Sequence, residues 1–507
     1  MQNNQIKKWG LIILIWLPII PIALVVYYLN QYAGINLTLR LCVSLILISS
    51  YLAILFLGCY FIKKQNYKKA SLISIISIAV IIGSGYFAYI NFRVYHTLNQ
   101  MIRTQSEISH SLVTLTQSEI QTRYDLENRT LAMLNITDER IAQGVEQFLE
   151  EAGLKESNEI IFYDSPVMMV HALYNGDLDA IIIDSNFGSV FSESRGFENI
   201  ERETQVIETF TMTTEITLTN NIAIAEEPFS ILLLGTNSMV EGNIHLGQVN
   251  TLMLATVNLQ NLSVTLTSIP RDSYVSVPCF QYTRDKLSHT NAGGTSCIIQ
   301  TVEHMFEMEI PYYIKLNFRG MIELVDAIGG IEVDVPFTFT EQNSRRQFGE
   351  HMITVYEGLQ RLNGEEALAL SRHRNSLPMQ DLDRVENQQL VLESILNEML
   401  TGGMTINDIL SVLNVLGENV DTNLSINEMT AIAQFMISLA PAFLHQNPLE
   451  KIHINNMVLT GEIGRAHALS VIFPSELLIE NYREIMMINL GKIDPIFKFD
   501  FTFNGFN

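Results

Sequence analysis

Three long apolar runs dominate the first hundred residues. They cover residues 10–29, 41–62 and 70–92, and no Asp, Glu, Lys or Arg interrupts any of them. Each run has about the 20 residues that a membrane-spanning helix needs. We therefore predict three transmembrane helices that act as an anchor, because a transport pathway would place ionisable side chains inside the spans. A cleaved signal peptide is the alternative for the first run, but two further spans follow it directly.

Basic residues beside the runs predict the orientation of this anchor. Lysines precede the first span and separate the second span from the third, whereas the loop between the first and second spans carries a single arginine at its end. These residues are Lys7, Lys8, Lys63, Lys64, Lys68, Lys69 and Arg40. The positive-inside rule then places the N-terminus in the cytoplasm and everything after about Arg93 outside the cell.

A mixed pattern follows, in which short apolar strands alternate with amphipathic helices. Residues 94–225 predict a small α/β accessory domain, with strands at 112–115, 159–163 and 180–183 and helices at 137–152 and 167–173. Thr137 is the expected cap of the first of these helices. Residues 125–184 resemble half of an extracellular solute-binding domain, and a spacer domain without a ligand is the alternative.

From residue 226 the same alternation predicts an α/β/α sandwich with a mixed central sheet. We expect strands at 229–234, 250–258, 262–269, 312–317 and 331–335, and helices at 318–327, 364–371, 384–400 and 426–439. A capping box of Ser425 and Glu428 opens the last helix. The expected organisation is a membrane segment at 1–93, the accessory domain at 94–225, a main domain at 226–402, and residues 403–507 completing or extending the outer part.

Charge and cysteine content narrow the choice of function. The chain has 31 Lys and Arg against 54 Asp and Glu, a formal net charge of −23. A nucleic-acid-binding protein would need the opposite balance, so we exclude that class. Cys42 and Cys59 lie in predicted spans, whereas Cys279 and Cys297 lie in the outer part, where an oxidising compartment would let them pair. Two free thiols are the alternative.

Against this acidic background, three short segments concentrate arginine. They are residues 268–272, 371–374 and 381–389, and they contain Arg271, Arg372, Arg374 and Arg384. A guanidinium group presents a planar fork of donors that suits phosphate oxygens. Arg372 and Arg374 would point to one side of an extended segment, and Arg384 and Gln388 would share one helix face. Pairing of these arginines with surface acids is the alternative.

The order and spacing of several motifs across residues 228–400 resemble the LytR-CpsA-Psr family. The motifs are ILLLG at 231–235, TLTSIPRD at 265–272, DKLSH at 285–289, LVDAIGGIEV at 324–333, LNGEEAL at 362–368, Arg-His-Arg at 372–374 and Asp-x-x-Arg at 381–384. The three spans and the intervening accessory domain resemble the capsule-associated CpsA branch. The resemblance implies an enzyme that moves a glycan phosphate from a polyprenyl pyrophosphate lipid to peptidoglycan.

The resemblance also implies roles for individual residues. The lipid tail would lie in an apolar tunnel, and a Mg²⁺ ion would bridge the pyrophosphate to two Asp residues. Carried over by motif, the clamp on the pyrophosphate consists of Arg271, Arg372, Arg374 and Arg384. The residues that orient the pyrophosphate would be Asp381 and Gln388, with Lys286 nearby. Asp272 would orient Arg271 or accept a proton.

The sequence departs from the family pattern at the metal site. The two metal-binding Asp positions hold Asn237 and Asn250, and Gln248 replaces one clamp arginine. A hard cation prefers anionic oxygen, so we expect Mg²⁺ to bind far more weakly, although Asn can still offer a carbonyl oxygen. Metal rescue by Asp272, Asp381 or Asp383 and a misalignment of this stretch are the other possibilities. We interpret His289 and His373 as structural rather than catalytic.

Several functions therefore stay open. The first is a glycopolymer–peptidoglycan phosphotransferase whose metal binding is weak or supplied by the substrate. The second is a non-catalytic polyprenyl-pyrophosphate binding protein that scaffolds or regulates assembly of envelope glycopolymers. A solute sensor that uses the accessory domain is the third. All three are expected in a multi-pass membrane protein with a cytoplasmic N-terminus.

Overall fold

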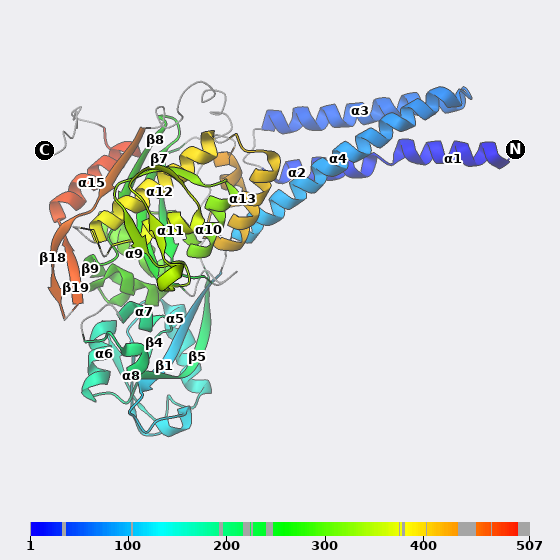
Figure 1. The fold of residues 1–507 in the computed structure, drawn as a ribbon. Coiled ribbons are helices and arrows are strands. Elements are labelled where there is room, and N and C mark those ends of the chain that lie inside the picture. The colour runs from blue at the N-terminus through cyan, green and yellow to red at the C-terminus, as the bar shows by residue number, and fades with distance from the viewer. Residues whose placement is uncertain are drawn as a thin grey trace. The chain divides into compact units, whose positions relative to one another are not determined.

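The computed structural model describes most of the chain (Figure 1). The described residues are 2–32, 37–102, 105–191, 196–215, 224, 227–239, 247–374, 376–377, 381–401, 403–433, 453–467 and 469–494. The chain divides into two compact units, residues 1–102 with 424–441 and residues 103–423 with 442–507.

The first unit contains three helical spans that are long and apolar enough to cross a membrane, as predicted. The spans are Lys7–Gln31, Leu37–Lys63 and Tyr67–Met101. The first span consists of two helices, α1 (Gln2–Trp16) and α2 (Ile19–Gln31), because Pro18 has no N–H group to continue the hydrogen-bond ladder between them. The other two spans are the helices α3 and α4.

A short helical segment at 426–433 also belongs to this unit. The capping box predicted at its start is confirmed. The backbone N–H of Ser425 donates to the Glu428 carboxylate at 2.7 Å, and the backbone N–H of Glu428 donates to the Ser425 hydroxyl at 3.3 Å. The predicted end of this helix at residue 439 lies outside the described residues.

In the second unit, five strands form the accessory sheet, in the order β3-β2-β4-β1-β5. The strands are β1 (Gln105–Leu115), β2 (Thr130–Leu134), β3 (Glu159–Tyr163), β4 (Ala180–Asp184) and β5 (Thr204–Glu215). β2 is parallel to β3 and β4, and β1 is antiparallel to β4 and β5. The helices α5 (Glu139–Glu151) and α6 (Pro166–Asn175) pack into two different cores, so the small α/β fold is confirmed.

Two local predictions in this region were wrong. The strand expected at 112–115 is only the end of β1, which pairs with β5 along its whole length, and alternating polar residues hid its first half. The helix expected from Thr137 begins at Glu139, and Asp138 caps it by accepting from the Arg140 N–H at 3.0 Å. Thr137 lies one residue before this cap, and its backbone N–H donates to the carbonyl of Cys279 at 3.0 Å.

Six strands form the central sheet, in the order β16-β11-β6-β7-β8-β17. The strands are β6 (Phe229–Thr236), β7 (Val249–Asn258), β8 (Ser263–Ser268), β11 (Tyr312–Asn317), β16 (Val420–Thr422) and β17 (His453–Val458). β6 is parallel to β11 and β8 is parallel to β17, whereas the other neighbouring pairs are antiparallel. The predicted mixed sheet is confirmed, and its two edge strands lie beyond residue 402.

Helices cover both faces of the central sheet (Figure 1). On one face, α9 (Gly294–Phe306) and α15 (Glu476–Asn489) bury their apolar side chains against β6 and β7, in a core that the accessory sheet shares. The helices on the other face are α10 (Phe318–Ala327), α11 (Gly364–Arg372), α12 (Asp381–Thr401) and α13 (Ile406–Asn419). They form a second core of their own. The α/β/α sandwich is therefore confirmed.

Residues 331–362 stay outside the central sheet, contrary to the expectation for 331–335. β12 (Ile331–Val335) pairs with β15 (Gly358–Leu362), and β13 (Phe339–Glu341) pairs with β14 (Ile353–Val355). Buried Val333 and Val335 alternate with exposed Glu332 and Asp334, so only one face of β12 is covered. That alternation fits a two-stranded sheet lying on the helices rather than a strand buried on both faces.

The remaining elements are short. Two further hairpins pair β9 (Tyr274–Val277) with β10 (Thr283–Lys286) and β18 (Gly461–Ala466) with β19 (Leu469–Pro474). The short helices are η1 (Arg123–Leu126), α7 (Phe187–Phe191), α8 (Ile200–Glu203), η2 (Pro278–Phe280), η3 (Leu287–Gly293) and η4 (Gly349–His351).

Candidate functional site

A cavity of about 410 Å³ lies at one edge of the central sheet. The carboxyl ends of β6, β8 and β11 and the amino end of β7 meet at this edge, where ligands bind in many open α/β sheets. Gly235, Asn250, Arg271 and Asn317 line the cavity from these strand ends. Gly235 lets β6 approach β7 closely, because a Cβ atom there would lie 2.9 Å from the Cβ of Thr251.

Apolar side chains form the deeper wall of the cavity. The sheet contributes Leu233, Met253, Ile314 and Leu316, and the helices contribute Phe318, Met321, Val391, Leu392 and Ile395. The two cores on either side of the sheet do not meet across this space. The cavity therefore has an apolar wall formed by the sheet and by α10 and α12, and the lipid tunnel expected from the family resemblance stays a prediction.

Positive charge gathers at the same cavity. Among the lining residues that the structure describes, five are arginines and one is acidic, Glu341. The arginines are Arg271, Arg346, Arg372, Arg374 and Arg384. The four arginines singled out from the sequence thus line one cavity, although they come from separate parts of the chain. Their role as a pyrophosphate clamp stays a prediction.

Arg372 is held by the loop between β13 and β14. Its Nη2 atom donates to the carbonyl of Gln342 at 2.6 Å and to that of Asn343 at 3.3 Å, and its guanidinium lies 5.7 Å from the ring centre of Phe318. Burial lowers the pKa of Arg372, Glu341 opposes this shift, and the neighbouring Arg346 adds to it. An anion bound between the two guanidinium groups would relieve their repulsion.

The extended segment expected around Arg372 and Arg374 is not present. Arg372 is the last residue of α11, and His373, which follows it, has an extended backbone. His373 is buried, with Nδ1 3.0 Å from a Glu341 carboxylate oxygen and Nε2 2.5 Å from the Ser376 hydroxyl. This pair holds the residue that follows α11, so Arg372 reaches the cavity from the end of the helix and Arg374 from the chain beyond it.

Arg384 and Gln388 reach the cavity from one face of α12, as their spacing predicted. Gln388 Nε2 donates to the carbonyl of Ser371 at 3.2 Å, which joins α12 to α11. The next residue, Gln389, donates to the Ser268 hydroxyl at 2.7 Å and to the Met457 carbonyl at 3.0 Å. These bonds fix α12 over the sheet. The side chain of Asp381, at the start of α12, lies outside the described residues.

Lys286 and Asp272 form an ion pair beside the cavity rather than in its lining. The Lys286 Nζ atom lies 2.9 Å from an Asp272 carboxylate oxygen, and both side chains are largely buried. Burial alone would raise the pKa of Asp272, but Lys286, Arg271 and Arg384 together hold it below its usual value. Asp272 is therefore a weak proton acceptor, and this geometry suits it to orienting its cationic neighbours.

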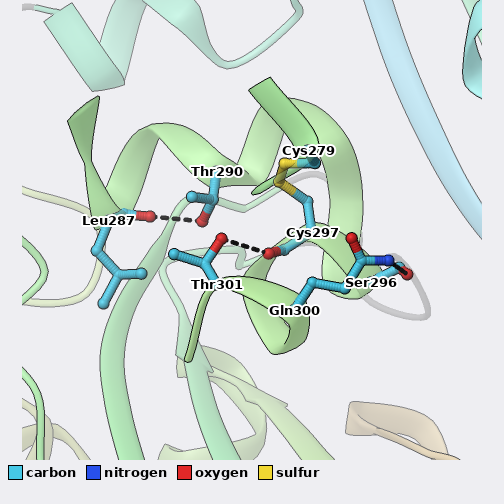
Figure 2. Close-up of a disulfide and its surroundings, with 7 residues drawn as sticks. All are labelled: Cys279, Leu287, Thr290, Ser296, Cys297, Gln300 and Thr301. Atoms are coloured by element: carbon cyan, nitrogen blue, oxygen red, sulfur yellow. Dashed lines mark hydrogen bonds between the residues drawn. A yellow bond between two sulfur atoms is a disulfide. The ribbon is translucent and has the colours of Figure 1, made fainter. Parts of the chain in front are cut away.

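A disulfide joins Cys279 to Cys297 (Figure 2). It ties η2 to α9 and encloses η3, which carries His289. The Nδ1 atom of His289 lies 2.7 Å from Asp285, and the other carboxylate oxygen of Asp285 accepts from the Ser165 hydroxyl at 3.2 Å. Both histidines singled out from the sequence are thus buried hydrogen-bonding residues that lie outside the lining of the cavity.

The positions proposed for the metal do not fit a divalent cation. Asn237 Oδ1 accepts from the Gln248 backbone N–H at 2.9 Å, and Asn250 Oδ1 accepts from the Arg271 guanidinium. Both amide oxygens are therefore directed at N–H donors, one of them cationic. Among the described residues, no group of three His, Cys, Asp or Glu side chains could hold a metal ion. Gln248 is itself buried in the cavity wall.

Arg346 and Asn317 are among the lining residues that the sequence analysis did not single out. Arg346 follows Arg345 in a chain with few basic residues, so the criterion that selected the other arginines could have found it. Its backbone N–H donates to the Asn343 carbonyl at 2.9 Å, in a turn where its own φ is 55°. Asn317 caps α10 by accepting from the Gly320 N–H at 2.7 Å. No local pattern marks it as a lining residue, because the cap alone explains its identity.

Comparisons with known proteins bear on the whole outer region. The LytR_cpsA_psr family matches residues 192–475. A protein of Enterococcus faecalis named polyisoprenyl-teichoic acid–peptidoglycan teichoic acid transferase TagU is 36% identical over 209 residues, 41% of this chain and 65% of that protein. The Bacillus subtilis protein of the same name is 34% identical over 208 residues, 40% of this chain and 62% of that protein.

These matches cover a little under two thirds of each relative's length. A crystal structure of Bacillus subtilis TagV is 26% identical, covers 53% of this chain and 99% of that chain, and superposes with a TM-score of 0.43. The family match spans more than half of the 507 residues and includes every arginine of the cavity. The protein belongs to the LytR-CpsA-Psr family.

Proposed function

We propose that this protein transfers a polyprenyl-pyrophosphate-linked envelope glycan to peptidoglycan. One observation carries the proposal: a cavity that is apolar along the sheet and α12 also gathers five arginines. A prenyl chain needs the first property and a pyrophosphate needs the second. A soluble anion would have no use for the apolar wall, and a neutral lipid would have no use for the arginines.

The arginines match the charge of such a ligand. A pyrophosphate esterified at both ends carries about two negative charges at neutral pH, whereas the described lining carries five positive charges and one negative. The excess positive charge would stabilise the additional negative charge that develops as the lipid phosphate leaves. Arg271 and Arg384 are almost wholly buried, so water screens them little.

The proposed reaction needs little covalent help from the protein. The acceptor hydroxyl oxygen of peptidoglycan bonds to the phosphorus next to the glycan, and the bond from that phosphorus to the bridging oxygen breaks. Polyprenyl phosphate leaves with the bridging oxygen, and the hydroxyl proton passes to water. Positioning and charge neutralisation by the arginines then account for most of the catalysis.

The proposed function also requires a particular orientation of the chain in the membrane. We place the three spans in the cell membrane with the N-terminus in the cytoplasm, and both sheets outside, where a lipid-linked donor and peptidoglycan are both accessible. We assign residues 1–93 to the anchor, 94–225 to the accessory domain, 226–402 to the transferase domain and 403–507 to its completion. The anchor and accessory domain favour a capsule-associated polymer, whereas the names of the relatives favour teichoic acid.

A second candidate function follows from the metal positions. Since Asn237 and Asn250 do not fit a cation, a protein that binds the lipid pyrophosphate without chemistry would have the same cavity. Such a protein would scaffold or regulate assembly of the polymer. The two candidates share the ligand and differ only in turnover.

Transfer by the purified full-length chain in detergent separates the candidates. The donor is a labelled polyprenyl-pyrophosphate-linked teichoic acid precursor and the acceptor is a peptidoglycan oligomer. We expect labelled peptidoglycan from the wild type and at least tenfold less from Arg384→Gln. Arg483→Ala, which changes a partly exposed residue of α15 paired with Glu307, should give the wild-type yield. Lipid binding without transfer would support the second candidate, and absence of binding would overturn both.

A further inference from the structure

The side-chain oxygens of Asn237 and Asn250, at the two metal positions, accept hydrogen bonds within the protein instead of facing a cation. Asn237 forms a two-way bridge to Gln248: its N–H donates to the Gln248 carbonyl at 3.1 Å, and its Oδ1 accepts from the Gln248 N–H at 2.9 Å. This bridge closes the corner between β6 and β7, where the strand register shifts after Gly235. An Asp at 237 could accept the same bond, so the bridge does not explain the amide.

Asn250 has a different role, because its hydrogen-bond partner, the Arg271 guanidinium, is a cation. Its Oδ1 accepts from the Arg271 guanidinium, and Arg271 is 5% exposed. A carboxylate in this place would also accept the bond, but it would neutralise Arg271. The amide orients the guanidinium and leaves its full positive charge at the cavity. Compared with the two Asp residues of the family pattern, Asn237 and Asn250 leave the cavity wall with up to two fewer negative charges.

We propose that this cavity binds a prenyl diphosphate without a divalent cation, and that Arg271, oriented by Asn250, supplies the positive charge that a cation would otherwise bring. The inference rests on the proposed function and deepens it. Five lining arginines against one lining glutamate exceed the charge of the diphosphate without any metal ion. In this arrangement Arg271 is a binding residue, and Asn250 is a positioning residue that acts through it.

Calorimetry on the full-length chain in detergent tests the inference, with geranylgeranyl pyrophosphate as the ligand. We expect the wild type to bind with the same affinity, within about threefold, in EDTA and in millimolar Mg²⁺. Asn250→Asp should bind at least about tenfold more weakly in EDTA, because the carboxylate pairs with Arg271. In Asn237→Asp/Asn250→Asp, Mg²⁺ should restore most of this loss, because two carboxylates offer the oxygens that Mg²⁺ prefers.

A second measurement reads metal binding directly, without lipid. Mg²⁺ titrated into the wild type should give no saturable heat, whereas the double variant should show a binding isotherm. Asn199→Asp, at the exposed N-cap of α8, is the matched control and should behave as the wild type in both experiments. Retained thermal stability of each variant excludes misfolding as the cause of weak binding.

The possible outcomes separate this inference from the proposed function. Binding of the prenyl diphosphate by the wild type only in Mg²⁺ would overturn the inference and leave the proposed function standing. Saturable Mg²⁺ binding by the wild type without lipid would do the same. Absence of prenyl diphosphate binding in both conditions would overturn the two together. Equal affinity of Asn250→Asp and the wild type in EDTA would show that the amide does not protect the charge of Arg271.

Discussion

The accessory sheet and the central sheet each present the carboxyl ends of parallel strands at one edge, yet only the central sheet leaves that edge open. At the accessory sheet, the carboxyl ends of β2, β3 and β4 lie against residues 278–293, the segment that runs from η2 through β10 to η3. Thr137 and Ser165 bond to this segment, and the space that remains is about 10 Å³, roughly one water molecule. At the central sheet the corresponding space is about 410 Å³.

The difference shows that a sheet edge becomes a site only where its neighbours leave it uncovered. The edge at which a solute-binding domain would receive its solute is closed here, because residues of η3 lie against β4 and α7. Fold resemblance therefore does not transfer a ligand. Among the described residues, the space at this edge is about 10 Å³, far smaller than a solute molecule.

The largest expected effect lies at the open edge, in Arg372→Ala. Removing this partly buried guanidinium, which we expect to contact the diphosphate, should cost about 3 kcal/mol, a loss of affinity of roughly 100-fold. Isothermal titration of geranylgeranyl pyrophosphate into the full-length chain measures it. Arg483→Ala removes a partly exposed arginine of α15 outside the cavity and should change the affinity by less than about twofold. An affinity for Arg372→Ala within threefold of the wild type would mean that Arg372 only supports the β13–β14 loop.

At the closed edge the corresponding change affects stability rather than binding. Cys279→Ser/Cys297→Ser opens a loop of 18 residues, which lowers the free energy of unfolding by about 3 kcal/mol. Circular dichroism during urea unfolding measures this loss. Cys42→Ser/Cys59→Ser removes the two free cysteines and should leave unfolding of the sheets unchanged. A larger loss of lipid affinity than of stability would break the distinction between the two edges.

Much of this fold could be predicted, because its elements have strong local signals. The buried run at 229–234 and the helix at 318–327, which ends before Gly329 and Gly330, appear within one or two residues of their predicted bounds. The failures involve partners far away in sequence. The first half of β1 has too many polar residues to predict a strand, and pairing with the distant β5 forms it. The cap of α5 is a local error of one residue, because Asp138 and not Thr137 accepts from the first turn.

The site divides in the same way. The spacing of Arg384 and Gln388 predicted that they share one face of α12. The family motifs predicted that Arg271 and Arg372 lie at one cavity. The partner of each amide could not be predicted, because the bond between Asn250 and Arg271 joins the start of β7 to the loop after β8. The substitution of Asp by Asn was visible in the sequence, whereas its physical consequence needed the geometry.

A smaller effect tests the apolar part of the open edge. Leu392→Trp places a larger side chain in the cavity wall, so it should weaken binding of a 20-carbon prenyl diphosphate about tenfold and that of a five-carbon diphosphate little. Calorimetry with the two ligands gives the ratio. Leu477→Trp, on the exposed face of α15, is the control. Equal losses for both ligands would show that the prenyl chain lies elsewhere.

The smallest effect belongs to Asp184, beside the closed edge. Burial raises the pKa of Asp184 to about 6 from a usual value of 3.8. The hydrogen bond that Asp184 accepts from the Asn186 N–H at 2.8 Å and the nearby Lys315 both lower this pKa. His110 lies opposite Asp184 in the β1–β4 pair. The folded state holds this proton more tightly than the unfolded state, so the contribution of Asp184 to stability falls as pH rises between about 4 and 6. Asp184→Asn should therefore gain about 1 kcal/mol relative to the wild type between pH 5 and pH 7.5.

Thermal unfolding at the two pH values measures the difference, and titration of His110 cancels because both proteins contain it. Asp177→Asn, an exposed change in the turn between α6 and β4, should give parallel curves. A parallel curve for Asp184→Asn would mean that water reaches Asp184 and that the edge is less tightly closed than its 10 Å³ space implies.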